Sequence, residues 1–143
     1  MRDKLDDLIA EFQELDPRER LELLLEFAEG LPELPGCYRS ERDAGRNRVR
    51  ECQTAVYLWV EAPDGRLQIF ADVAPEAPTV KGFVAMLVNT FCGATLDDIR
   101  AVPADLIQRL GLDEAMGMTR MRGMSGILNR IRGEAERHLN MPS

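Results

Sequence analysis

The stretch that decides the fold runs from Ala55 to Val73 and reads AVYLWVEAPDGRLQIFADV. Residues 55–60 are strongly β-prone and predict a strand over 55–62, while residues 66–73 alternate apolar and polar side chains and predict a second strand. A short Asp-Gly turn between two such runs is typical of an antiparallel hairpin. Because a hairpin alone is marginally stable, we expect a third strand within 45–52 and helices packed on one face.

Helical patterns flank the hairpin on both sides. Residues 3–14 have apolar side chains on one face, and Asp16-Pro17-Arg18-Glu19 can cap and begin a second helix that Gly30 ends. Residues 37–48 predict a long polar loop. Further helices are expected over Val80–Phe91 with Thr79 as N-cap, from Thr95, over Pro103–Leu110, and from about Thr119 to His138.

This order of elements predicts a single α+β domain over residues 1–143, with a small antiparallel sheet packed against several helices. Gly123 and Gly126 are poor helix residues, each costing up to ~1 kcal/mol relative to alanine. Their position within the last helix indicates that another part of the backbone packs closely there, or that the helix begins later.

Charge and hydropathy exclude several function classes. The net charge is −7 and the isoelectric point is about 4.8, which disfavours a nucleic-acid function. No stretch approaches the ~20 apolar residues of a membrane span, and the charged N-terminus lacks the apolar region of a secretory signal, so we expect a cytoplasmic protein without a membrane partner. Residues 37–50 differ from the rest of the chain, because their five arginines and two acidic residues give them a net charge of +3.

The three cysteines, Cys37, Cys52 and Cys92, do not predict a disulfide framework or a zinc site. Their number is odd, they are widely spaced, and the single histidine, His138, lies in the last predicted helix. We expect Cys92 to be a small core residue and Cys37 to be an exposed thiol. Neither a metal nor any other bound cofactor is predicted.

Cys52 is the strongest candidate for chemistry. It lies between the arginine-rich segment and the first strand, where a scaffold can hold a reactive group within reach of a partner. Arg48 and Arg50 favour the thiolate and Glu51 opposes it. The sequence has no nucleotide-binding, zinc-protease or serine-hydrolase motif, so what remains is a thiol that reacts by exchange with a partner's sulfur.

The sequence around Cys52 resembles the V-x-G-C-Q-S-x-V-W signature of SufE-type proteins, which are sulfur acceptors for cysteine desulfurases in iron–sulfur cluster assembly. Other segments occur in the order that the family shows, so the resemblance covers nearly the whole chain. The resembling segments are Val49-Arg50-Glu51-Cys52-Gln53-Thr54-Ala55-Val56-Tyr57, Leu31-Pro32-Glu33-Leu34, the hairpin, Val80-Lys81-Gly82-Phe83 and Thr119-Arg120-Met121-Arg122-Gly123-Met124.

The resemblance implies a SufE/IscU-like fold and a function in sulfur transfer. Cys52 would take sulfur from a SufS-like desulfurase, whose own cofactor is pyridoxal phosphate, stimulate that enzyme and pass the sulfur to a SufBCD-like scaffold. Arg120 matches a family arginine and would help to dock the desulfurase or stabilise the thiolate. Supporting or docking roles fall to Arg50, Glu51 and Gln53. An apolar pocket lined by Trp59 or Tyr57 would shelter the persulfide.

Glu51 and Thr54 depart from the family pattern, which has glycine and serine at these positions. Glu51 places a negative charge beside the thiol and would be strained if the loop requires a positive φ. Two alternatives to sulfur transfer therefore remain. One is an iron–sulfur or metal-binding scaffold of the IscU-like fold that uses the three cysteines, and the other is an adaptor that binds the desulfurase without accepting sulfur.

Overall fold

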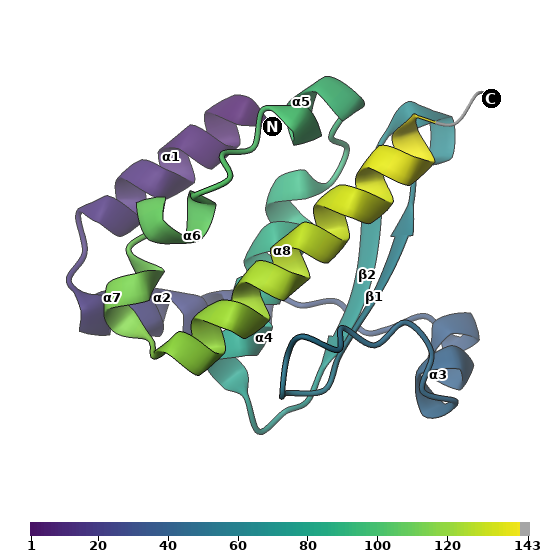
Figure 1. The fold of residues 1–143 in the computed structure, drawn as a ribbon, viewed down its shortest axis with the longest axis horizontal. Helices are drawn as coiled ribbons and strands as arrows, with labels where there is room; N and C mark the ends of the chain where they lie inside the picture. The colour runs from purple at the N-terminus through teal and green to yellow at the C-terminus, as the bar shows by residue number, and fades with distance from the viewer. Residues whose placement is uncertain (141–143) are drawn as a thin grey trace.

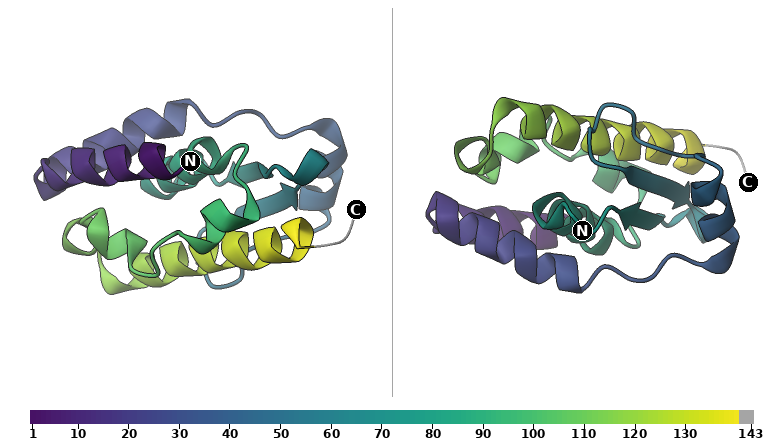
Figure 2. Two further views of the ribbon diagram at one scale, coloured as in Figure 1. Left: turned by 90° about the horizontal axis from the view of Figure 1, so that it is seen from above. Right: turned by 90° about the horizontal axis from the view of Figure 1, so that it is seen from below.

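The long C-terminal helix packs on a small two-stranded sheet, and the N-terminal helices lie to one side of that sheet (Figure 1). The computed structural model describes residues 1–140. The N-terminal helix pair and the long C-terminal helix lie on opposite sides, with the hairpin and the helix Pro78–Phe91 between them (Figure 2). The elements are α1 Arg2–Gln13, α2 Pro17–Glu29, α3 Gly36–Asp43, β1 Val56–Glu61, a 3-10 turn Pro63–Gly65, β2 Gln68–Val73, α4 Pro78–Phe91, α5 Leu96–Arg100, α6 Leu106–Arg109, α7 Leu112–Ala115 and α8 Met118–Leu139.

The predicted hairpin is confirmed. Strands β1 and β2 pair antiparallel, with Val56 opposite Val73 and Glu61 opposite Gln68. Asp64 and Gly65 in the turn have positive φ angles of 56° and 74°, which explains why an Asp-Gly pair occupies it. The face of β1 that carries Val56, Leu58 and Val60 is buried in the main core.

The third strand is reduced to a single bridge within residues 1–140. Arg48 bridges Tyr57, and two hydrogen bonds join the segment to β1: Val49 N donates to Val56 O at 2.8 Å and Leu58 N donates to Asn47 O at 3.1 Å. The pairing extends no further, since Asn47 has a positive φ of 61° and the chain enters a turn after Val49.

The N-terminal helices are confirmed, including the capping box in which Asp16 accepts from Glu19 N and Glu19 accepts from Asp16 N. Helix α2 packs closely on α4, where a β-carbon built on Gly82 would lie 1.9 Å from the carbonyl oxygen of Leu24. Only glycine permits this approach. Helix α4 also packs on β2, and α8 packs on β1.

Three details of the predicted helices were wrong. Residues 36–43 form α3 instead of lying in a polar loop, because Tyr38 stacks on Trp59 and Arg42 pairs with Asp72 at 3.1 Å. The N-cap of α4 is Ala77, and Thr79 lies in the first turn. The methionine- and glycine-rich segment before α8 contains the short helix α7.

Among residues 1–140, no helix has both the length and the apolar character that a membrane crossing requires.

Candidate functional site

The Cys52 loop connects the Arg48 bridge to β1 and packs against α8. Its anchor is Val49, which is fully buried and bonded to Val56 across the bridge. Cys52 N donates a hydrogen bond to Val49 O at 3.4 Å, which closes the turn. The loop therefore starts from a fixed point and returns to a fixed strand shortly after the thiol.

The thiol of Cys52 is sheltered. The residue is 6% exposed and belongs to the same buried cluster as Val56, Leu58 and Met124. A β-carbon built on Gly123 of α8 would lie 3.0 Å from Cys52 Sγ. A sulfur atom in this position is screened from solvent by the helix, which limits its reaction with oxidants and small thiols.

The adjacent residue, Glu51, occupies a second glycine position on α8. A β-carbon built on Gly126 would lie 2.5 Å from Glu51 Cβ, closer than two such atoms can approach. Gly123 and Gly126 thus form a notch that receives residues 51 and 52. This confirms the prediction that a second backbone segment packs on these glycines, and the helix begins before them, at Met118.

The other predicted site residues lie around the loop at the surface. Arg50, Glu51 and Gln53 are exposed while Cys52 between them is buried, so the loop presents three polar side chains to a partner. Arg120 is also exposed, and its guanidinium donates to Thr79 Oγ1 at 2.9 Å. Within the described chain its hydrogen bond goes to α4 and not to the thiol.

The aromatic residues expected to shelter the thiol do not do so. Trp59 and Tyr57 project from the face of β1 opposite to Val56 and Leu58, because side chains alternate along a strand. The Trp59 ring stacks on Tyr38 of α3, with ring centroids 4.9 Å apart. The pocket around Cys52 is made instead by α8 and the main core.

The remaining cysteines are separate from this site. Cys37 is exposed, as predicted. Cys92 is exposed too, and not a core residue, because it is the C-cap of α4 and Gly93 turns the chain with a φ of 79°. Among residues 1–140, no three His, Cys, Asp or Glu side chains are grouped so that they could hold a metal ion. The single histidine is also separate from the Cys52 site: His138 Nε2 lies 3.4 Å from Oε2 of Glu134, one turn earlier on α8.

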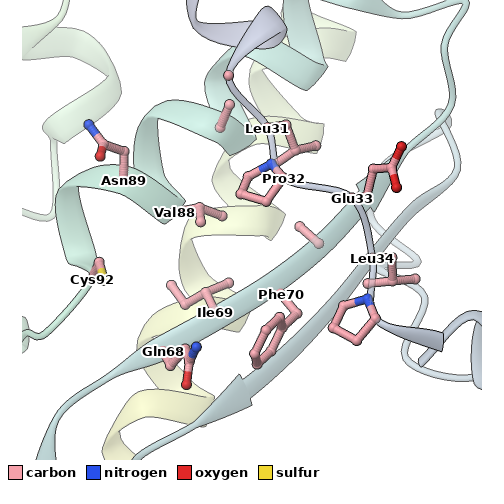
Figure 3. Close-up of a pocket in the computed structure, with 14 residues that line it drawn as sticks. Leu31, Pro32, Glu33, Leu34, Gln68, Ile69, Phe70, Val88, Asn89 and Cys92 are labelled. Atoms are coloured by element: carbon pink, nitrogen blue, oxygen red, sulfur yellow. The ribbon is translucent and has the colours of Figure 1, made fainter. Parts of the chain in front are cut away.

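A cavity of about 330 Å³ lies along β2, α4 and the segment that joins α2 to α3 (Figure 3). Its lining is mostly apolar, and Leu31, Ile69 and Val88 point into it. None of its lining residues belongs to the Cys52 loop or to α8. The cavity is therefore separate from the candidate site at Cys52.

A second, open groove adjoins the Cys52 loop. Its volume is about 810 Å³, and it lies between Glu51, α6, α7 and one face of α8. Sequence reasoning missed this groove, although the methionines that line it were evident in the sequence. The lining residues are Glu51, Gln108, Asp113, Met116, Gly117, Met118, Met121, Arg122, Ser125, Gly126 and Asn129.

Fold and site together define an α+β protein that holds one sheltered thiol on a loop beside a small sheet. The model of the SufE family, described as an Fe-S metabolism associated domain, matches residues 6–135. The chain belongs to the SufE family. Its role therefore lies in iron–sulfur metabolism.

Individual relatives agree with this assignment. An uncharacterized SufE-like protein of Mycobacterium tuberculosis is 36% identical over 129 residues, which cover 90% of this chain and 88% of that protein. A SufE-like protein of Rhizobium meliloti is 31% identical over 140 residues, which cover 94% of this chain and 96% of that protein. The solution structure of a hypothetical protein from Thermus thermophilus matches with a TM-score of 0.78 and 28% identity, covering 96% of this chain and 97% of that one.

Proposed function

We propose that this protein accepts sulfur from a cysteine desulfurase on Cys52, stimulates the turnover of that enzyme, and passes the sulfur to a SufBCD-like cluster scaffold. The observation that carries the proposal is the position of Cys52. Cys52 corresponds to the cysteine of the SufE-type signature that the sequence resembles, lies on a loop between two fixed points, and is a residue that is only 6% exposed. Such a site suits a group that must be protected between two encounters.

The transfer itself needs no cofactor on this chain, and the pyridoxal phosphate belongs to the desulfurase. The Cys52 thiolate attacks the terminal sulfur of the persulfide on the donor. A new S–S bond forms at Cys52, the S–S bond of the donor breaks, and the donor cysteine leaves as a thiolate. The persulfide proton moves with the terminal sulfur, so the exchange involves no net oxidation or reduction.

The buried position of Cys52 implies that the loop must leave the notch for transfer. In the described structure the thiol lies against α8, whereas Arg50, Glu51 and Gln53 are exposed, although Glu51 also contacts Gly126. A partner that binds these three exposed side chains can draw the loop outward. When the loop returns, the persulfide is enclosed again between the core and α8.

Desulfurase turnover tests the proposal. With excess free cysteine, wild-type protein should accelerate release of sulfur under reducing conditions, and Cys52→Ser should abolish the acceleration while retaining binding. The variant Cys37→Ser/Cys92→Ser is the matched control and should stimulate as the wild type does. Full stimulation by Cys52→Ser would instead support an adaptor.

The scaffold alternative would require Cys37 and Cys92 to join Cys52, and both are exposed on other elements.

A further inference from the structure

We propose that the groove between Glu51, α7 and α8 receives a segment of the sulfur donor that carries a basic side chain flanked by apolar ones, and that Glu51 couples its binding to release of the Cys52 loop. The inference rests on the proposed function, since it names how that donor is recognised. This surface, the Glu51 groove, consists of the residues lining the cavity of about 810 Å³.

The apolar part of the Glu51 groove comes from three methionines, Met116, Met118 and Met121. Met118, the first residue of α8, is 77% exposed. It lines the groove together with Met116 and Met121, and a contiguous exposed apolar patch is typical of a surface that a partner covers. Methionine is flexible and polarizable, so these side chains can adapt to apolar groups of different shapes.

The charges of the Glu51 groove favour a basic occupant. Glu51 and Asp113 line the groove together with Arg122, so the lining carries one more acidic than basic side chain. Within residues 1–140, neither acid takes part in an ion pair or a side-chain hydrogen bond. Covering an unpaired carboxylate is unfavourable unless the partner supplies a positive charge. A lysine or arginine of the donor meets this requirement.

Glu51 links the groove to the thiol. Its Cβ lies in the Gly126 position of the notch, its carboxylate oxygen Oε2 lies 3.5 Å from the point where a β-carbon on Gly126 would be, and both residues line the groove. Cys52 is the next residue and occupies the Gly123 position. Because residues 51 and 52 are adjacent, a donor contact that shifts the backbone of Glu51 out of the Gly126 position also displaces Cys52 from the Gly123 position.

Binding to the cognate desulfurase, measured at several salt concentrations, tests the groove. Three variants, Glu51→Gln, Asp113→Asn and Met118→Ser, should each raise the Kd about tenfold, the equivalent of about 1.4 kcal/mol. The two charge variants should also reduce the salt dependence of binding. The control is Asp7→Asn, which removes an exposed acid on α1 and should leave the Kd unchanged. Wild-type Kd values for all three groove variants would overturn the docking surface.

The rate of sulfur transfer at saturating desulfurase tests the coupling. Glu51→Gln should transfer about tenfold more slowly than Asp113→Asn, because only residue 51 is joined to the loop. Equal rates for the two variants would overturn the coupling. The mass of the wild type after reaction is recorded in the same series: if no sulfur appears on it, the proposed function fails, whereas the Kd values still decide whether the groove is the docking site.

Discussion

The sulfur atom of Cys52 lies against Gly123 of α8, 3.0 Å from the point where a β-carbon of residue 123 would be. One residue earlier, Glu51 lies against Gly126 at a separation that leaves no room for a β-carbon on residue 126 unless the loop shifts. The resting position of the reactive loop therefore depends on two glycines that belong to a helix much later in the sequence. A larger residue at either position would crowd the loop.

Gly126→Ala should push the loop out of its notch. The added methyl group would lie 2.5 Å from Glu51 Cβ, so the loop must move, whereas alanine is otherwise favourable in a helix. In a Cys37→Ser/Cys92→Ser background, alkylation of Cys52 by iodoacetamide should become about tenfold faster. This factor corresponds to a free energy of loop opening that is smaller by ~1.4 kcal/mol. Quenched-flow labelling with mass detection measures this rate.

The control for this experiment is Gly133→Ala on the same helix, where nothing lies within 4 Å of the added β-carbon. It should stabilise the protein by up to ~1 kcal/mol and leave the alkylation rate of Cys52 unchanged. A Gly126→Ala protein that is folded by circular dichroism and alkylates at the control rate would contradict the notch.

The three thiols of the wild type should react in two classes. Cys37 and Cys92 are exposed and should be alkylated first, while the buried Cys52 should lag behind. In denaturant the three rates should converge, because the difference comes from burial. Peptide mapping after timed labelling assigns each rate, and equal labelling of Cys52 in the native protein would show that the loop rests in an open state.

Gly82→Ala should destabilise the fold without touching the site. Its β-carbon would lie 1.9 Å from Leu24 O, so α2 and α4 would have to separate. Overpacking of this kind costs roughly 1–3 kcal/mol. The midpoint of urea unfolding should fall by the corresponding amount, with Gly133→Ala again as the control, and an unchanged midpoint would contradict the close contact of the two helices.

The phenol of Tyr38 should resist ionisation. Burial and a hydrogen bond to Glu61 raise the pKa of Tyr38 above its ordinary value of 10.0. Because this pKa is higher in the folded state than in the unfolded chain, the protonated phenol of Tyr38 contributes to stability. The contribution is complete below pH ~10 and is lost as the pH rises above that value. Absorbance at alkaline pH should therefore show Tyr38 ionising later than in the unfolded chain, and Tyr38→Phe should remove this late step. Ionisation at the ordinary pKa would contradict it.

Local patterns were sufficient to predict the hairpin and most helices. The Asp64-Gly65 turn and the Asp16–Glu19 capping box are encoded by neighbouring residues, and both are confirmed. Helix α3 was not predictable in this way, because it has no buried residue of its own and is held by Tyr38 stacking on Trp59, twenty-one residues later in the sequence. The exposure of Cys92 similarly depends on how Gly93 turns the chain at the end of α4.

The candidate site was predictable in its identity but not in its surroundings. The position of Cys52 before β1 and the need for close packing at Gly123 and Gly126 were both inferred from the sequence. The sequence could not indicate that these two features contact each other, because that contact requires α8 to cross β1. For the same reason the pocket was assigned to Trp59 or Tyr57, and the Glu51 groove was missed.

The destination of the sulfur is the most direct test of the proposed function. The protein with Cys37→Ser and Cys92→Ser is mixed with a desulfurase that already carries a persulfide, and its intact mass is recorded without reductant. We predict the added mass of one sulfur atom, located on the peptide that contains Cys52, and no addition when Cys52 is also replaced by serine. An unchanged mass, or sulfur on any other residue, would contradict sulfur transfer to Cys52.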